Sequence, residues 1–240
     1  MSTVLYAVDA GVATMTLNRP QSRNALNREM CEEIIACTAK AAADPEVKLV
    51  LVRAQPPVFC GGADLKERQG MGHAQVRERR LKGFAAYAAL ESLPMPSVAV
   101  VEGPVVGSGC EIAGACDFIV ATPAASFRTP EALRGTVGAT QRLPRILGKR
   151  LAKDLMFTGR VLGAEEARAA GLVSRLVLAS EIESALEEIK TSIRNAPRNA
   201  LRLAKRCIDR GVELDPAGAL ETEIAAIDEQ LAAGQWMGKA

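Results

Sequence analysis

The sequence predicts an α/β fold with a mostly parallel sheet, followed by a helical C-terminal region. Over most of the chain, short apolar runs of strand length alternate with amphipathic patterns of helix length. This alternation is typical of parallel sheets covered by helices. Roughly the last sixty residues instead show helical patterns with no strand between them. With 240 residues, the chain is long enough for one large domain or for a core with an appendage.

Each expected element has its own local signal. Two runs rich in Val, Thr and Leu flank a turn at residues 9–11, which predicts an N-terminal hairpin. Asn27 is a candidate N-cap for an amphipathic helix that ends near Asp44, just before a proline. The alternation continues with a buried strand at 48–54, a helix over about 73–92, a buried strand at 96–103, a helix from about 108 and a strand at 117–122. We place a boundary near Ala179, which predicts a core of residues 1–179 and a C-terminal helical region of residues 180–240.

The charge balance argues against a nucleic-acid-binding function. Thirty basic residues stand against 28 acidic ones, and the formal net charge is only +2. The chain therefore lacks the broad basic surface that nucleic-acid binding usually needs. The densest basic cluster, at residues 76–82, is typical of a solvated helix face.

The cysteine and histidine content argues against a metal site. Six cysteines form no CxxC pair and His73 is the only histidine, so no thiolate or imidazole cage is predicted. The sequence shows neither an export signal nor an apolar run of membrane-spanning length. We therefore expect a cytoplasmic protein with free thiols, no metal and no membrane association.

Glu111 interrupts an otherwise small and apolar run at residues 100–118. A carboxylate out of water costs several kcal/mol unless it is paired, hydrogen-bonded or neutralised. Glu111 is therefore either a structural acid bonded to nearby backbone donors or part of a functional site. A second acid, Glu131, follows after one predicted strand and a turn. Two carboxylates in one pocket can act as general base and general acid, which is what adding or removing water across a double bond requires.

Two glycine-bearing segments, residues 60–64 and 107–111, each follow a predicted buried strand and open a predicted helix. Helix starts expose unpaired N–H groups, so two such starts side by side would favour a developing oxyanion. The alternative is that the glycines only permit tight strand-to-helix turns. Neither segment matches a nucleotide-binding glycine motif, and Ser108 does not lie in a GxSxG nucleophile motif.

Several ordered motifs resemble the enoyl-CoA hydratase/isomerase, or crotonase, superfamily along nearly the whole chain: LNRPQSRNALN, FCGGADLKER, VVGSGCEIAGACDFIVAT, SFRTPE and TQRLPRILGKRLAKDLMFTGRVLGAEEARAAGLVSRLV. The resemblance implies a spiral of ββα units with a C-terminal helical region that packs trimers, which often pair into hexamers. It also implies an enoyl-CoA hydratase, a lyase that adds water reversibly across the 2,3 double bond of a trans-2-enoyl-CoA to give a 3-hydroxyacyl-CoA. Coenzyme A is then part of the substrate, and no cofactor is implied.

The same resemblance suggests a role for individual residues. The two oxyanion-hole N–H groups fall on Ala63 and Ser108, and the two glutamates that orient water in hydratases fall on Glu111 and Glu131. Glycine is usual where Ser108 stands, so its side chain is expected to narrow the oxyanion hole. The backbone positions that line the CoA groove, together with a basic residue near the nucleotide phosphates, fall on Asn24, Ala25, Leu26, Gly61, Asp64 and Lys66.

Three alternatives remain open at this point. The chain also resembles the methylglutaconyl-CoA hydratase branch, whose substrate carries an extra carboxylate that Arg128 or Arg134 would bind. An enoyl-CoA isomerase would use the same fold, although isomerases commonly lack one of the two glutamates. A non-catalytic member that binds RNA or another protein is the third alternative, and the near-neutral charge and the acid pair argue against it.

Overall fold

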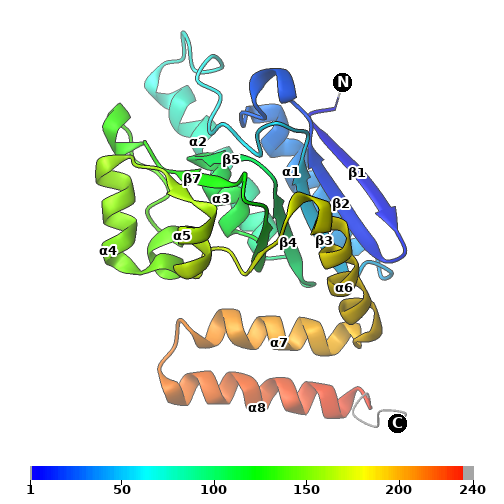
Figure 1. Ribbon diagram of the computed structural model, residues 1–240. Coiled ribbons are helices and arrows are strands. Elements are labelled where there is room, and N and C mark those ends of the chain that lie inside the picture. Colours follow the sequence, from blue (N-terminus) through cyan, green and yellow to red (C-terminus); the bar gives the residue numbers. More distant parts are fainter. Residues whose placement is uncertain (1, 235–240) are drawn as a thin grey trace.

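The computed structural model describes residues 2–234 and confirms the predicted alternation of strands and helices (Figure 1). Its larger sheet has six strands in the order β1-β2-β3-β4-β6-β9. β1 and β2 are antiparallel, and every other neighbouring pair is parallel. The six strands are β1 (Val4–Asp9), β2 (Val12–Leu17), β3 (Leu49–Ala54), β4 (Ser97–Val101), β6 (Phe118–Ala121) and β9 (Arg175–Leu176).

The N-terminal elements form as the sequence predicts. β1 and β2 pair along their whole length as a tight hairpin. α1 (Arg28–Ala43) begins after Asn27, whose side chain accepts a hydrogen bond from the backbone N–H of Met30. This contact satisfies one of the donors that a helix start leaves free. The helix ends at Ala43 with Asp44 as its C-cap, as predicted from the following proline.

Alternate residues of the central strands face two layers of the core. Leu49 and Leu51 of β3 pack into one hydrophobic cluster, and Val50 and Val52 pack into the other. A parallel strand that is covered on both faces produces this period of two. α6 (Ile182–Asn195) covers the first cluster with Ile182, Leu186, Ile189 and Ile193. α1, α2 (His73–Glu91) and α3 (Ser108–Gly114) contribute to the second.

A second, smaller sheet brings two functional segments together. β5 (Pro104–Val106) is parallel to β7 (Ser126–Arg128), and β8 (Leu162–Gly163) is antiparallel to β7. α3 begins two residues after the last residue of β5, and Glu131 lies three residues after the last residue of β7. Because the carboxyl ends of parallel strands meet at one edge of a sheet, the start of α3 and Glu131 lie close together.

The glycine-bearing segment at residues 60–64 joins β5 of this sheet through an isolated bridge from Cys60 to Val105, and a second isolated bridge joins its Ala63 to Leu26. The prediction that this segment opens a helix is wrong. Turns occupy the residues that follow, and α2 begins only at His73. The Asp64 side chain caps the first turn by accepting hydrogen bonds from the backbone N–H groups two and three residues later, but Gly70, with a φ of +81°, lies outside the helical conformation and separates these turns from α2.

The C-terminal region is helical, as predicted. α7 (Arg198–Gly211) and α8 (Pro216–Ala232) lie side by side as a pair below the rest of the molecule in Figure 1. Residues 235–240 of this region lie outside the described residues, and the boundary near Ala179 stays a prediction. The remaining elements are α4 (Arg142–Thr158), α5 (Ala164–Ala169) and three 3-10 helices (Pro20–Ser22, Ala132–Arg134, Ala179–Glu181). Across the described part of the chain, no helix is both long and apolar enough to cross a membrane.

Candidate active site

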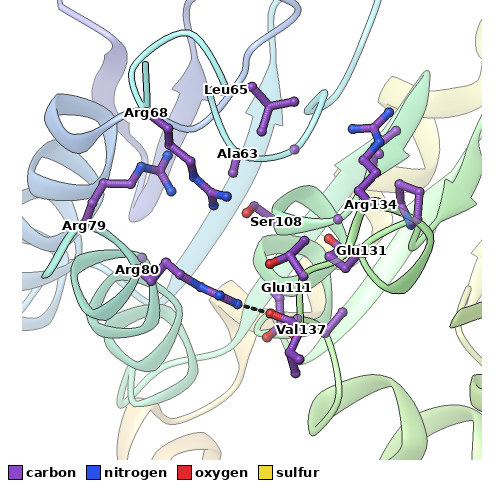
Figure 2. Close-up of a pocket in the computed structure, with 18 of the residues that line it drawn as sticks. Ala63, Leu65, Arg68, Arg79, Arg80, Ser108, Glu111, Glu131, Arg134 and Val137 are labelled. Atoms are coloured by element: carbon purple, nitrogen blue, oxygen red, sulfur yellow. Dashed lines mark hydrogen bonds between the residues drawn. The ribbon is translucent and has the colours of Figure 1, made fainter. Parts of the chain in front are cut away.

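A cavity of about 80 Å³ opens where the small sheet meets the segment at residues 60–64. Figure 2 shows Ala63, Ser108, Glu111 and Glu131 around it. A larger cavity of about 810 Å³ adjoins it between α2 and residues 137–142. Both cavities are lined by Glu111, so one acid faces both of them. The structure thus brings together all four residues that the sequence predicts for the reacting centre.

The backbones of the two glycine-bearing segments approach each other closely because the residues at the points of contact are glycines, which have no side chain. A Cβ atom on Gly62 would lie 3.2 Å from the carbonyl oxygen of Val106. A Cβ on Gly109 would lie only 2.8 Å from both the Cβ atom and the carbonyl oxygen of Cys60. Glycine is therefore required for this approach.

The N–H groups of Ala63 and Ser108 are available at the cavity. Ser108 is the first residue of α3, where a helix leaves its N–H without an internal partner. Ala63 lies in a bridge whose hydrogen bonds are made by its neighbours, from Leu26 N–H to the Gly62 carbonyl and from Asp64 N–H to the Leu26 carbonyl. Neither N–H donates to another group within residues 2–234. Two free donors facing one cavity suit a carbonyl oxygen that becomes negatively charged.

Glu111 is held by an arginine. It is 7% exposed, and its Oε2 atom lies 2.7 Å from Nη1 of Arg142, the first residue of α4. Arg142 also forms an ion pair with Glu91 at the end of α2. This pairing explains how a carboxylate can lie in an apolar run, because a buried charge needs a partner of opposite sign.

Glu131 has a different environment. Its Oε2 atom is buried and, among the described residues, has no hydrogen-bond partner. Its carboxylate lies against two glycines, since a Cβ added to Gly107 or Gly138 would meet Glu131 atoms at 2.2 Å and 3.1 Å. Burial raises the pKa of Glu131, and the nearby charge of Glu111 raises it further. One acid is therefore ion-paired, while burial makes the charged form of the other less favourable than it would be in water.

More arginines line the cavity than the sequence analysis named, since Arg68, Arg79 and Arg80 lie there as well as Arg134. Arg79, predicted to lie on a solvated helix face, is buried and forms an ion pair with Glu67. Arg80 donates to the carbonyl oxygen of Val137 across the cavity mouth, as Figure 2 shows. Arg68 has a buried Nε atom without a partner within the described part of the chain, and burial lowers its pKa.

Of the six residues predicted to line a CoA groove, two lie in or beside the cavity and four do not line it. Gly61 lines the cavity, and Leu26 carries the bridge to Ala63. Asn24 is fully buried and its side-chain amide donates to the carbonyl oxygens of Gln55 and Val58, at 2.7 and 2.6 Å, so its side chain braces the loop. Ala25, which follows Asn24 in the sequence, is half-buried. Asp64 forms a 2.9 Å ion pair with Arg19. Lys66 is exposed and does not line the cavity.

The two arginines predicted to bind a substrate carboxylate differ in position. Arg134 lines the cavity. Arg128 is exposed and donates to the carbonyl oxygen of Gly159 at 2.6 Å, outside the cavity lining. Within residues 2–234, no group of His, Cys, Asp and Glu side chains is arranged to hold a metal ion.

The sequence match covers almost the whole described chain. The family model for enoyl-CoA hydratase/isomerase matches residues 7–234. The chain belongs to the enoyl-CoA hydratase/isomerase family. Its predicted crotonase fold is confirmed by a Bacillus anthracis enoyl-CoA hydratase structure, which superposes with a TM-score of 0.90 at 32% identity over 94% of this chain and 90% of that one.

Relatives within this family carry more than one activity name. The human mitochondrial enoyl-CoA hydratase domain-containing protein 2 is 39% identical over 91% of this chain and 78% of its own length. The enoyl-CoA isomerase/hydratase fer4 of Mycosarcoma maydis is 34% identical over 92% of this chain and 85% of its length. A Thermobifida fusca family structure in complex with CoA superposes with a TM-score of 0.89 at 25% identity, covering 97% of this chain and 94% of that one. Family membership supports an acyl-CoA ligand, and the reaction must be argued from the site.

Arg142 is the residue that sequence reasoning missed. Its only signal was its place at the start of a helix after the Glu131 loop, which does not reveal that it reaches Glu111.

Proposed function

We propose that this protein is an enoyl-CoA hydratase that adds water reversibly to a trans-2-enoyl-CoA and gives a 3-hydroxyacyl-CoA. The observation that carries the proposal is the presence of two differently held carboxylates, Glu111 and Glu131, beside two free N–H groups in one cavity. Water addition needs one group to accept a proton and another to donate one.

The two N–H groups and the two acids would have different tasks in this reaction. The N–H groups of Ala63 and Ser108 would bind the thioester carbonyl and stabilise the negative charge that builds on its oxygen. Removing one such donor typically costs about 2.7–4 kcal/mol of transition-state stabilisation. The backbone geometry at residues 61–63 and 107–109 should therefore matter as much as either acid.

The proton transfers follow from the environments of the acids. Glu111, paired with Arg142, would take a proton from water as the water oxygen bonds to Cβ and the double-bond electrons move toward the thioester. Glu131, whose pKa is raised by burial, would deliver its proton to Cα. The proton gained by Glu111 then returns to Glu131 or to solvent, so the net reaction is the addition of one water.

The CoA part of the substrate would lie along Asn24, Ala25, Leu26, Gly61 and Asp64, with Lys66 near the phosphates. The support for this placement is the short path from Leu26 to the cavity through its bridge to Ala63. The exposed side chain of Lys66 is free to meet a phosphate group. A cytoplasmic location remains a prediction.

The reaction type is tested with a trans-2-enoyl-CoA in heavy-oxygen water. We expect labelled oxygen at Cβ and an intact thioester, since the acids would hold water against the double bond while Ala63 and Ser108 stabilise the enolate. Mass spectrometry of the acyl-CoA products gives the answer. Migration of a 3-enoyl double bond without oxygen uptake would indicate an isomerase, and release of free CoA with label in the carboxylate would indicate a hydrolase.

A second candidate, hydration of an enoyl-CoA that carries an extra carboxylate, is favoured by one observation. Arg68, Arg80 and Arg134 line the cavity, and none of them has an acidic partner among the described residues. An anionic group on the acyl chain would be attracted to these charges. Comparing crotonyl-CoA with glutaconyl-CoA in the same assay separates the candidates by the ratio of kcat/KM. A chain that binds neither acyl-CoA would instead be a non-catalytic member.

We also propose that the protein assembles as a trimer or a hexamer. The paired helices α7 and α8 bury little apolar surface against the core, and Ile208 and Val212 are 66% and 76% exposed. Exposed apolar patches of this kind usually mark an interface. Light scattering is expected to give three or six times the mass of one chain, and a monomer at working concentration would refute the proposal.

A further inference from the structure

Arg142 lies between two carboxylates at the edge of the candidate site. Its Nη1 atom is 2.7 Å from Oε2 of Glu111, and its Nε atom is 3.1 Å from Oε1 of Glu91. The side chains of Arg142 and Glu111 are 17% and 8% exposed, so their ion pair is largely removed from water. Glu91 is 55% exposed and lies on the outer side of the guanidinium.

These contacts fix the plane of the guanidinium. An arginine donates in fixed directions, so bonds along two of its edges leave it little freedom to rotate. The ring of Tyr87 adds a third contact, with its centroid 5.9 Å from Cζ of Arg142. A guanidinium held in this way also holds the carboxylate that it binds.

The consequence for Glu111 is geometric. Arg142 donates to the Oε2 atom of Glu111, which leaves Oε1 as the atom that can meet a water molecule in the cavity. Within the described residues, Glu131 has no basic side chain at hydrogen-bond distance. The two acids therefore differ in how firmly they are oriented, and Arg142 is the cause.

We propose that Arg142 is a positioning residue, which orients the Glu111 carboxylate so that one of its oxygen atoms takes a proton from the attacking water. This inference rests on the proposed hydratase function. The competing role is a structural brace that only holds α4 against α2. A brace would affect unfolding without a specific effect on turnover.

Three variants separate these roles: Arg142→Met, Arg142→Lys and Arg145→Met. Arg145 is the matched control, because it lies on the same helix in an exposed ion pair with Glu213. With crotonyl-CoA, we expect Arg142→Met to lower kcat on the order of 10²-fold, the scale of a misplaced catalytic group, while KM changes less than about threefold. Arg142→Lys should recover part of the loss because it restores the charge without the fixed plane. The control should match the natural sequence.

Crystal structures of Arg142→Met and Arg145→Met provide a readout that does not depend on the reaction. The Glu111 carboxylate should rotate in the first and stay in place in the second. If the natural sequence does not hydrate crotonyl-CoA, the proposed function fails and these structures alone decide the role of Arg142. An unmoved Glu111, or Arg142 variants that lose thermal stability but keep kcat, would overturn the inference.

Discussion

Glu131→Gln is expected to lower kcat for crotonyl-CoA hydration by roughly 10²–10⁴-fold, the usual scale for a general acid or base. Glutamine keeps the size and shape of the side chain but carries no acidic proton for Cα. The fold should persist, because the buried Oε2 atom has no partner to lose among the described residues. Steady-state kinetics measure the effect, and calorimetric titration with butyryl-CoA measures whether ligand binding is retained.

Glu165→Gln serves as the control for this prediction. Glu165 is an exposed glutamate on α5, so its change makes the same chemical substitution without touching the cavity. Glu111→Gln should show a loss of similar size if the two acids share the work. A Glu131→Gln protein with a near-normal rate would end the two-acid proposal.

Gly107→Ala is expected to lower kcat by at least about 10²-fold, because the added methyl group displaces the Glu131 carboxylate. The new Cβ atom would lie 2.2 Å from Oε1 of Glu131, so the carboxylate must move away. Since this carboxylate is the end of a flexible side chain, the fold can survive while the proton donor is displaced. Gly107 also has a φ of +51° with a ψ of −109°, a conformation that residues with a Cβ atom rarely adopt, so the alanine variant should lose on the order of 1–3 kcal/mol in the free energy of unfolding.

Gly171→Ala separates the backbone strain from the collision. Gly171 has a φ of +82°, but a Cβ atom there would meet nothing within 4 Å. This variant should also lose stability in urea unfolding, because its φ is positive, but it should keep a normal kcat. If both variants lost activity equally, displacement of Glu131 would not be the explanation.

The elements that were predicted correctly have signals within their own sequence. Asn27 as a helix cap and the buried strand at residues 48–54 rest on local patterns, and both are confirmed. The small sheet was not predicted because β5 and β7 have three residues each, too few to show a period. Its existence depends on long-range pairing, which one sequence does not display.

The same distinction applies to the site. Glu111 was singled out because an acid in an apolar run is unusual, and Glu131 because it is a second acid one predicted strand and a turn later; both line one cavity. The Arg142–Glu111 pair was missed because it depends on how α4 docks against α2 and α3. The burial of Arg79 was missed for a similar reason, since its partner Glu67 lies in a turn before the helix.

α3 carries both Ser108 and Glu111, three residues and nearly one turn apart on a rigid support. An α-helix rises about 1.5 Å per residue, so the two positions differ by about 4.5 Å along its axis. The helix would therefore fix the distance between the site that binds the thioester carbonyl and the site where water is added. The tail beyond that carbon would enter the adjoining cavity of about 810 Å³. Substrates with different tails should then differ in affinity, while the position of hydroxylation along the chain stays the same.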